Sequence, residues 1–155
     1  GTTFTIFFPA VAAMTSQAVP AVATNFRGQG HILLVDDEPL LVELGQDMLE
    51  QLGYTVTTSS NSFAALALLQ QQDNHFDALI TDQTMPGMTG MELATKALAL
   101  RPQLPIILCT GFSSLVDEQQ AKQCGVRAFL MKPFKQEHLA HQLCHLLPTA
   151  PPPAD

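Results

Sequence analysis

Short apolar runs alternate with stretches of helical periodicity over most of the chain. Five runs of aliphatic and β-branched residues are predicted to form strands, at residues 32–35, 54–58, 78–81, 106–109 and 128–131. After each run, apolar residues recur at intervals of three or four, which is the period of a helix. Strands that alternate with helices are typical of a parallel sheet covered on both faces. The pattern therefore predicts a doubly wound α/β fold with five parallel strands.

Start and stop signals set the bounds of the predicted helices. Pro39 suits a first helical turn and Gly53 a helix end, so the first helix is predicted from 39 to about 52. Its apolar stripe consists of Leu41, Leu44, Met48 and Leu52. The second helix can be capped by Asn61 or Ser62 and is predicted to end at about 72, and the third can be capped by Thr89 and end at about 99. The fourth can be capped by Ser113 or Ser114 and end at about 124, and the fifth is predicted from about Gln136 to 147.

The two ends of the chain lie outside this alternation. Residues 1–9 contain the run TTFTIFF, which is typical of a strand and is followed by Pro9. Residues 10–29 are rich in Ala, Thr, Pro and Gly and are predicted to be a linker, and residues 148–155 a flexible, proline-rich tail. One domain is thus predicted over residues 30–147.

Composition narrows the class of protein. Of the 155 residues, 46% are hydrophobic, so the chain can bury a core and is not disordered throughout. The net charge of −7 argues against a nucleic acid or an anionic membrane as partner. No apolar run approaches the roughly 20 residues of a membrane span. The three cysteines form no CxxC pair, which argues against a disulfide scaffold and indicates a reducing, cytoplasmic compartment.

Carboxylates are concentrated where basic residues are missing. Between Arg27 and Lys96 the sequence has no Lys or Arg, but it has ten Asp and Glu residues. The spacing of Glu43, Asp47 and Glu50 puts them on one side of the first predicted helix, where we expect them to be solvated.

Other polar side chains stand where predicted strands end. Asp36 and Asp37 follow the first strand, Asp82 the third, Thr110 the fourth and Lys132 the fifth. In a doubly wound sheet these ends meet at one edge. Three carboxylates there would repel one another unless a bound cation or a distant lysine lay among them, and oxygen ligands suit Mg²⁺. One carboxylate could then attack a phosphoryl group, while the lysine and the hydroxyl stabilise the transferring oxygens.

Four sequence blocks appear in order along the chain: LLVDDEP, LITDQTMPGMTG, PIILCTGFS and AFLMKPF. Together they resemble the motif blocks of the response-regulator receiver family over about residues 30–147. The resemblance implies a flavodoxin-like (βα)5 fold with strand order 2-1-3-4-5. It also implies a two-component protein that accepts a phosphoryl group, with Mg²⁺, from a histidine kinase or a histidine phosphotransfer domain.

The resemblance also implies a role for each residue at the strand ends. Asp82 would be the phosphoacceptor, and Lys132 would contact the phosphoryl oxygens. Asp37 would bind Mg²⁺ directly and Asp36 directly or through water. Asp82 and the backbone carbonyl of Thr84 would be further metal ligands.

Family members signal through a switch, for which this chain offers Thr110 and Phe129. Many members have tyrosine where Phe129 stands, and a phenylalanine can switch only through packing. The surface that would respond consists of the fourth helix, the fifth strand and the fifth helix, which is also a possible homodimer interface. Pro133 allows a cis peptide bond that would aim the ammonium of Lys132 into the site.

The amino end carries a second resemblance. GTTFTIFFP is similar to the closing strand of a histidine-kinase ATP-binding domain. This implies that the chain is the carboxyl-terminal receiver of a hybrid sensor kinase, whose parent chain could be attached to a membrane. Apart from its own phosphorylation and dephosphorylation, such a piece would not be an enzyme.

Two other functions are alternatives to a receiver. A phosphatase of the haloacid-dehalogenase kind is expected to carry DxDx[TV] after a strand, and neither DDE at 36–38 nor DQT at 82–84 matches it. A phosphorylation-independent interaction module usually lacks one of the acids or the lysine, and this chain has them all.

The last predicted helix carries several histidines at helical spacing. His141 and His145 are four residues apart, with His138 and Cys144 nearby, which is a spacing that can hold a metal ion. The leucines between them mark the buried face, so we expect the histidines to form an exposed, partly cationic face near the helix end.

Overall fold

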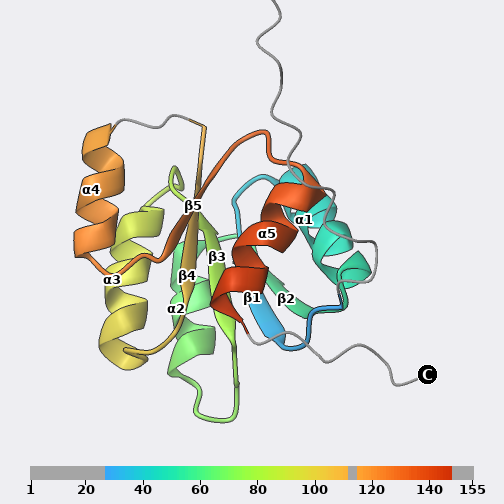
Figure 1. Ribbon diagram of the computed structural model, residues 1–155. Coiled ribbons are helices and arrows are strands. Elements are labelled where there is room, and N and C mark those ends of the chain that lie inside the picture. The colour runs from blue at the N-terminus through green and yellow to red at the C-terminus, as the bar shows by residue number, and fades with distance from the viewer. Residues whose placement is uncertain (1–26, 112–114, 148–155) are drawn as a thin grey trace, which may run out of the picture.

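The computed structural model describes residues 27–111 and 115–147. Within them a single parallel sheet has the strand order β2-β1-β3-β4-β5 (Figure 1). The strands are β1 (His31–Val35), β2 (Thr55–Ser59), β3 (Ala78–Asp82), β4 (Ile106–Thr110) and β5 (Ala128–Met131). The predicted fold class and strand order are confirmed.

Helices cover both faces of the sheet, as expected for a parallel sheet whose crossovers are helical. They are α1 (Pro39–Gln51), α2 (Ser62–Gln70), α3 (Gly90–Leu100), α4 (Leu115–Gln123) and α5 (Gln136–Leu146). α1 and α5 lie on one face, and α2, α3 and α4 lie on the other (Figure 1). No described helix is long and apolar enough to span a bilayer.

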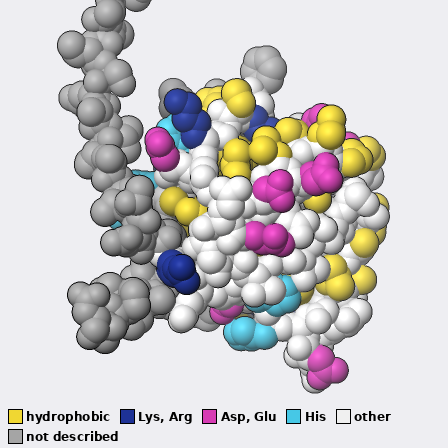
Figure 2. Space-filling model, turned by 90° about the vertical axis from the view of Figure 1, so that its right-hand side faces the viewer, with side chains coloured by type: hydrophobic (Ala, Val, Ile, Leu, Met, Phe, Trp, Pro, Cys, Tyr) yellow, Lys and Arg dark blue, Asp and Glu magenta, His cyan; other side chains and the backbone are white. Residues whose placement is uncertain are grey.

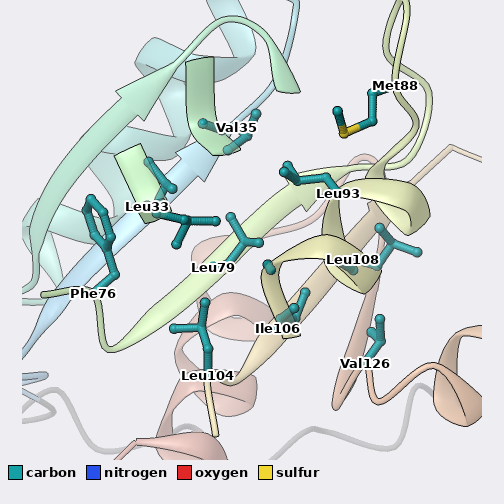
Figure 3. Close-up of a cluster of buried hydrophobic side chains, with 14 of the residues drawn as sticks. Leu33, Val35, Phe76, Leu79, Met88, Leu93, Leu104, Ile106, Leu108 and Val126 are labelled. Carbon is teal, nitrogen blue, oxygen red and sulfur yellow. The ribbon is translucent and has the colours of Figure 1, made fainter. Parts of the chain in front are cut away.

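Each face of the sheet has its own hydrophobic core, because successive strand side chains point to opposite sides. Leu33, Leu79 and Ile106 belong to the core under α2, α3 and α4 (Figure 3). Their neighbours Ile32, Ile80 and Ile107 belong to the core under α1 and α5. All strand positions in β3 and β4 are buried, which fits central strands and explains their continuous apolar runs.

The buried stripe of α1 differs from the prediction. Leu44 is 51% exposed, and the buried positions of the helix are Gly45 and Leu49. A Cβ atom on Gly45 would lie 2.9 Å from Leu34 Cδ2, so the helix approaches the sheet most closely at its glycine. Close approach at Gly45 turns the apolar stripe partly toward solvent. Figure 2 shows this side of the molecule, with acidic side chains gathered among hydrophobic ones.

Side-chain hydrogen bonds show which of the predicted residues cap α2 and α3. Asn61 caps α2, because its Oδ1 accepts a hydrogen bond from Ala64 N at 2.7 Å. Thr89 caps α3 in a reciprocal arrangement with Glu92. The hydrogen bonds from Thr89 lower the pKa of the Glu92 carboxyl below its ordinary value.

Several predictions fall on parts of the chain outside the described residues. These are the strand at 1–9, the linker up to residue 26, the tail at 148–155 and the cap of α4 at Ser113 or Ser114. Among the elements that are described, bounds differ from the predicted ones by no more than two residues. The largest difference is α2, which ends at Gln70 instead of about residue 72.

Candidate functional site

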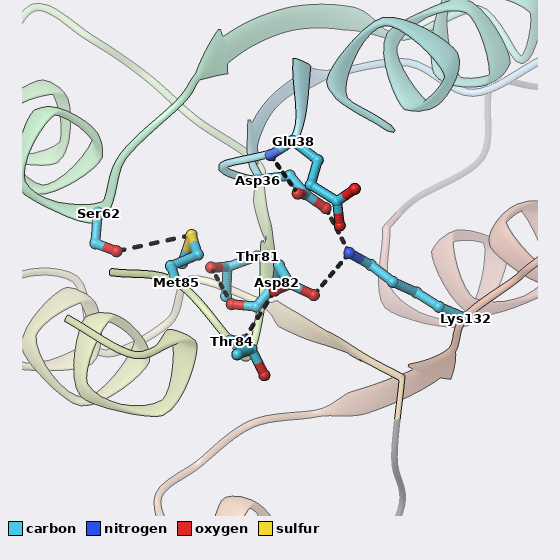
Figure 4. A network of polar contacts seen from close by, with 8 residues as sticks. All are labelled: Asp36, Glu38, Ser62, Thr81, Asp82, Thr84, Met85 and Lys132. Carbon is cyan, nitrogen blue, oxygen red and sulfur yellow. Dashed lines mark hydrogen bonds and ion pairs between the residues drawn. The ribbon is translucent and has the colours of Figure 1, made fainter. Parts of the chain in front are cut away.

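At the carboxyl ends of β1, β3 and β5, one lysine contacts two aspartates. Lys132 Nζ lies 2.6 Å from Asp36 Oδ2 and 2.8 Å from Asp82 Oδ1 (Figure 4). The aspartate side chains are only 7% and 8% exposed, respectively. Buried carboxylates need a charged partner, and sequence reasoning left a cation or a distant lysine as alternatives. In the structure this partner is Lys132, which is 96 residues from Asp36 in the sequence.

The pair of carboxylates controls the ionisation of Lys132. Burial lowers the pKa of the ammonium, but hydrogen bonds and charges from Asp36 and Asp82 outweigh it and raise the pKa above its ordinary value. Both aspartates therefore favour the charged form of Lys132. The peptide bond between Lys132 and Pro133 is cis, as expected.

Asp37 completes a cluster of three carboxylates that opens to solvent. Asp36, Asp37 and Asp82 each offer an oxygen, and these atoms lie within 4.8 Å of one another. Asp37 is exposed, whereas the other two are buried. Three carboxylates against one ammonium leave an excess of negative charge, and oxygen donors are the ligands that Mg²⁺ and Ca²⁺ prefer. The residues present thus fit a divalent cation.

The backbone at Thr84 lies next to the central aspartate. Thr84 N donates a hydrogen bond to Asp82 Oδ2 at 2.8 Å, while Oδ1 of the same carboxylate receives Lys132 (Figure 4). Each oxygen of Asp82 is therefore held by a different donor, which fixes the plane of the carboxylate. Sequence reasoning placed Thr84 among the metal ligands, and the structure puts its backbone beside the cluster.

Thr110 and Phe129 lie near this site but in different surroundings. Thr110 ends β4 and is buried, and its carbonyl accepts a hydrogen bond from Lys132 N at 2.8 Å. Phe129 is half-buried and packs against the core under α2, α3 and α4. On β4, next to Thr110, burial raises the pKa of the Cys109 thiol to about 12, so this thiol stays protonated and unreactive.

The loop after Asp82 is folded back tightly onto β3. Gly90 N donates to Gln83 O at 3.0 Å, and Met91 N donates to the side-chain oxygen of Gln83 at 3.1 Å. At Gly90 a Cβ atom would collide with the backbone oxygen of Asp82 and would lie 2.8 Å from Leu108 Cδ1. Only glycine permits this close approach of α3 to the end of β3.

Gly90→Ala is expected to destabilise the fold by about 1–3 kcal/mol, because the backbone of Asp82 cannot yield without moving the loop. Denaturant unfolding measures the loss. Gly111→Ala is the matched control, since a Cβ atom there meets nothing within 4 Å. Equal stability of the two variants would contradict the close approach at Gly90.

Ser62 ties the same loop to α2, and sequence reasoning missed this role. Its hydroxyl donates to Met88 O at 2.6 Å. The same hydroxyl lies 3.7 Å from Met85 Sδ (Figure 4). Ser62 is fully buried, on the stripe that continues with Ala65 and Leu69. The signal in the sequence is a polar residue on an otherwise apolar helix face, but the local pattern predicts for Ser62 only a role as an alternative cap.

Ser62→Ala is expected to cost about 1–2 kcal/mol, because the buried carbonyl of Met88 loses its donor. Thermal unfolding at matched protein concentration measures the difference. Ser60→Ala, at an exposed position, should leave stability unchanged. An equally small effect of both substitutions would show that the Ser62 hydrogen bond contributes nothing.

Comparison with known proteins decides the family. A family model described as "Response regulator receiver domain" matches residues 32–143, which include every residue of the cluster. The chain belongs to the response regulator receiver family. It is therefore a receiver domain of two-component signal transduction.

Individual relatives agree with this assignment. The chain is 34% identical over 125 residues to the transcriptional regulatory protein GlrR of Escherichia coli, covering 81% of this chain and 28% of GlrR. It is 33% identical over 157 residues to the sensor protein EvgS of the same organism, covering 96% of this chain and 13% of EvgS. The chain thus spans less than a third of the length of either relative.

A solved structure matches the receiver fold. It is the receiver domain of the sensor histidine kinase PA1611 from Pseudomonas aeruginosa, which holds a magnesium ion in its active site cleft. The PA1611 receiver and this chain are 29% identical in sequence, and their structures superpose with a TM-score of 0.67. The match covers 77% of this chain and 98% of the PA1611 receiver.

Proposed function

We propose that this receiver accepts a phosphoryl group on Asp82 from the phosphohistidine of a histidine kinase or a histidine phosphotransfer domain. The observation that carries the proposal is the contact of Lys132 with both Asp82 and Asp36 beside an open third carboxylate. A carboxylate nucleophile, a fixed cation and a place for a divalent ion are the parts that phosphoryl transfer needs.

In the transfer, an oxygen of Asp82 attacks phosphorus, and the phosphorus–nitrogen bond of phosphohistidine breaks. The imidazole nitrogen leaves with the bonding electron pair. Lys132 stabilises negative charge on the transferring oxygens, and Thr84 N holds the carboxylate in position. Mg²⁺, when bound, supplies further neutralisation of the phosphoryl oxygens. Its proposed ligands are Asp36, Asp37, Asp82 and the backbone carbonyl of Thr84.

The signal is proposed to leave the site through Thr110 and Phe129. Thr110 is linked to the lysine segment by the hydrogen bond from Lys132 N. Phe129, three residues before Lys132, is half-buried and lines the groove between β5 and α5, so a change in its packing would alter that surface. The responding surface would then be α4, β5 and α5, where a partner or a second copy of the receiver could bind.

We further propose that the chain derives from a hybrid sensor kinase, with its receiver on the cytoplasmic side. The match to EvgS covers 96% of the chain and must therefore extend well beyond residues 30–147 into the amino-terminal segment. PA1611 provides a second sensor kinase that carries a similar receiver. In this proposal residues 1–9 end a kinase domain, 10–29 link it to the receiver, and 148–155 form a tail.

Incubation with acetyl phosphate tests the proposal. Intact-mass measurement should find one added phosphoryl group in the presence of Mg²⁺ and none after chelation of divalent ions. Beryllofluoride with Mg²⁺ should shift the amide resonances of Thr110 and Phe129. Absence of both effects would replace this proposal with a phosphorylation-independent interaction module.

A further inference from the structure

Two imidazoles on α5 lie at the separation that a shared metal ion requires. His141 and His145 are both exposed, as the sequence predicted, and their Nε2 atoms are 3.3 Å apart. Two nitrogens that bind one tetrahedral ion at about 2.0–2.1 Å lie about 3.3–3.4 Å from each other. The spacing of four residues on a helix holds both rings on one face.

The direct contact between the rings is a weak competitor for a metal ion. A separation of 3.3 Å exceeds the usual length of a strong N–H hydrogen bond, and the rings meet edge-on at 76°. Among the described residues neither ring has another recorded partner. One Nε2–H at most can be donated between two neutral rings, so a shared hydrogen bond and a shared metal ion exclude each other.

The surroundings favour a cation. His145 lies in the last turn of α5, where the unpaired carbonyls and the helix dipole attract positive charge. Exposure leaves the remaining coordination positions open to water. Within the described chain, only Asp36, Asp37 and Asp82 form a converging group of three or more potential ligands, so the α5 pair supplies two protein ligands.

From this geometry we propose that His141 and His145 form a transition-metal site on α5, separate from the acidic cluster. Imidazole nitrogens suit Zn²⁺, Cu²⁺ and Ni²⁺, whereas Mg²⁺ prefers oxygen, so ligand chemistry separates the two sites. The groove between β5 and α5 is lined by Phe129, Met131 and His141. An ion on His141 would therefore lie at the rim of the surface that is proposed to respond to phosphorylation.

Zinc titration by calorimetry, with Mg²⁺ at saturating concentration to occupy the acidic cluster, tests this site. Cys124 and Cys144 are exposed thiols, so all measurements use a background in which both are serine. We expect the background protein to bind one Zn²⁺ that His141→Gln and His145→Gln each weaken at least about tenfold, since loss of even an outer-shell partner costs roughly 10–100-fold. Histidine Cε1 proton resonances of both residues should shift together.

His75→Gln is the matched control, because His75 is exposed but lies in the loop before β3. Its substitution should leave zinc affinity unchanged. Absence of zinc binding, or binding that neither His141→Gln nor His145→Gln weakens more than His75→Gln does, would overturn the proposed site. Because every variant keeps Asp82, phosphoryl acceptance measured in parallel distinguishes failure of this site from failure of the proposed function.

Discussion

Asp82→Asn is expected to abolish phosphoryl acceptance from acetyl phosphate or from a phosphorylated histidine domain. The amide nitrogen and oxygen of asparagine cannot serve as the carboxylate nucleophile, although the side chain keeps nearly the same shape. Asp82 is also the centre of the cluster, since its two oxygens contact Lys132 and Thr84 N. Intact-mass measurement with Mg²⁺ should find no phosphorylated chain.

Asp47→Asn is the control for this experiment. Asp47 is an exposed carboxylate on α1, and its loss removes the same charge without touching the cluster. The variant should be phosphorylated to the same extent as the wild type. Full phosphorylation of Asp82→Asn, with the group mapped to another residue, would contradict the assignment of Asp82.

Lys132→Met is expected to lower the free energy of unfolding by about 3 kcal/mol in the absence of divalent ions. Removal of the ammonium leaves two buried carboxylates facing each other, and breaking a buried pair in this way is strongly destabilising. Methionine preserves the length of the side chain, so packing changes little. Denaturant unfolding with a chelator measures the loss.

A divalent ion should recover part of this loss, because it can neutralise the same carboxylates. Unfolding of Lys132→Met should therefore depend on Mg²⁺ more steeply than unfolding of the wild type. Lys96→Met, at an exposed position of α3, provides the control. The double variant with Asp82→Asn should be less destabilised than the sum of the single variants. Strict additivity would mean that Lys132 and Asp82 do not interact.

The gathering of Lys132 and the acidic cluster at one edge of the sheet was predictable because the residues involved share one local signal. Asp36, Asp82 and Lys132 each stand where a short apolar run ends, and parallel strands present such ends at one edge of the sheet. The structure brings these side chains together at that edge, as the prediction expected. The prediction could not choose between a bound cation and a lysine as the partner of the acids, because local sequence does not measure distances between strands.

Other features depended on contacts that no local pattern records. Leu44 has the right spacing for a buried stripe, but the close approach of α1 at Gly45 leaves it half-exposed. Ser62 looked like a second choice for a cap, but the position of the β3–α3 loop makes it a donor to Met88 O. Both features depend on contacts between residues distant in the sequence, Gly45 with Leu34 and Ser62 with Met88.

The sequence by itself determined the succession of strands and helices along the chain, the class of fold and the residues that line the carboxyl edge of the sheet. Periodicity and residue type are local properties, and they suffice for these features. The tertiary structure alone decided that Lys132 joins Asp36 to Asp82 and that His141 and His145 converge on one point. Such distances depend on how the helices pack on the sheet and on side-chain rotamers. Neither can be inferred from the residue pattern of a single segment.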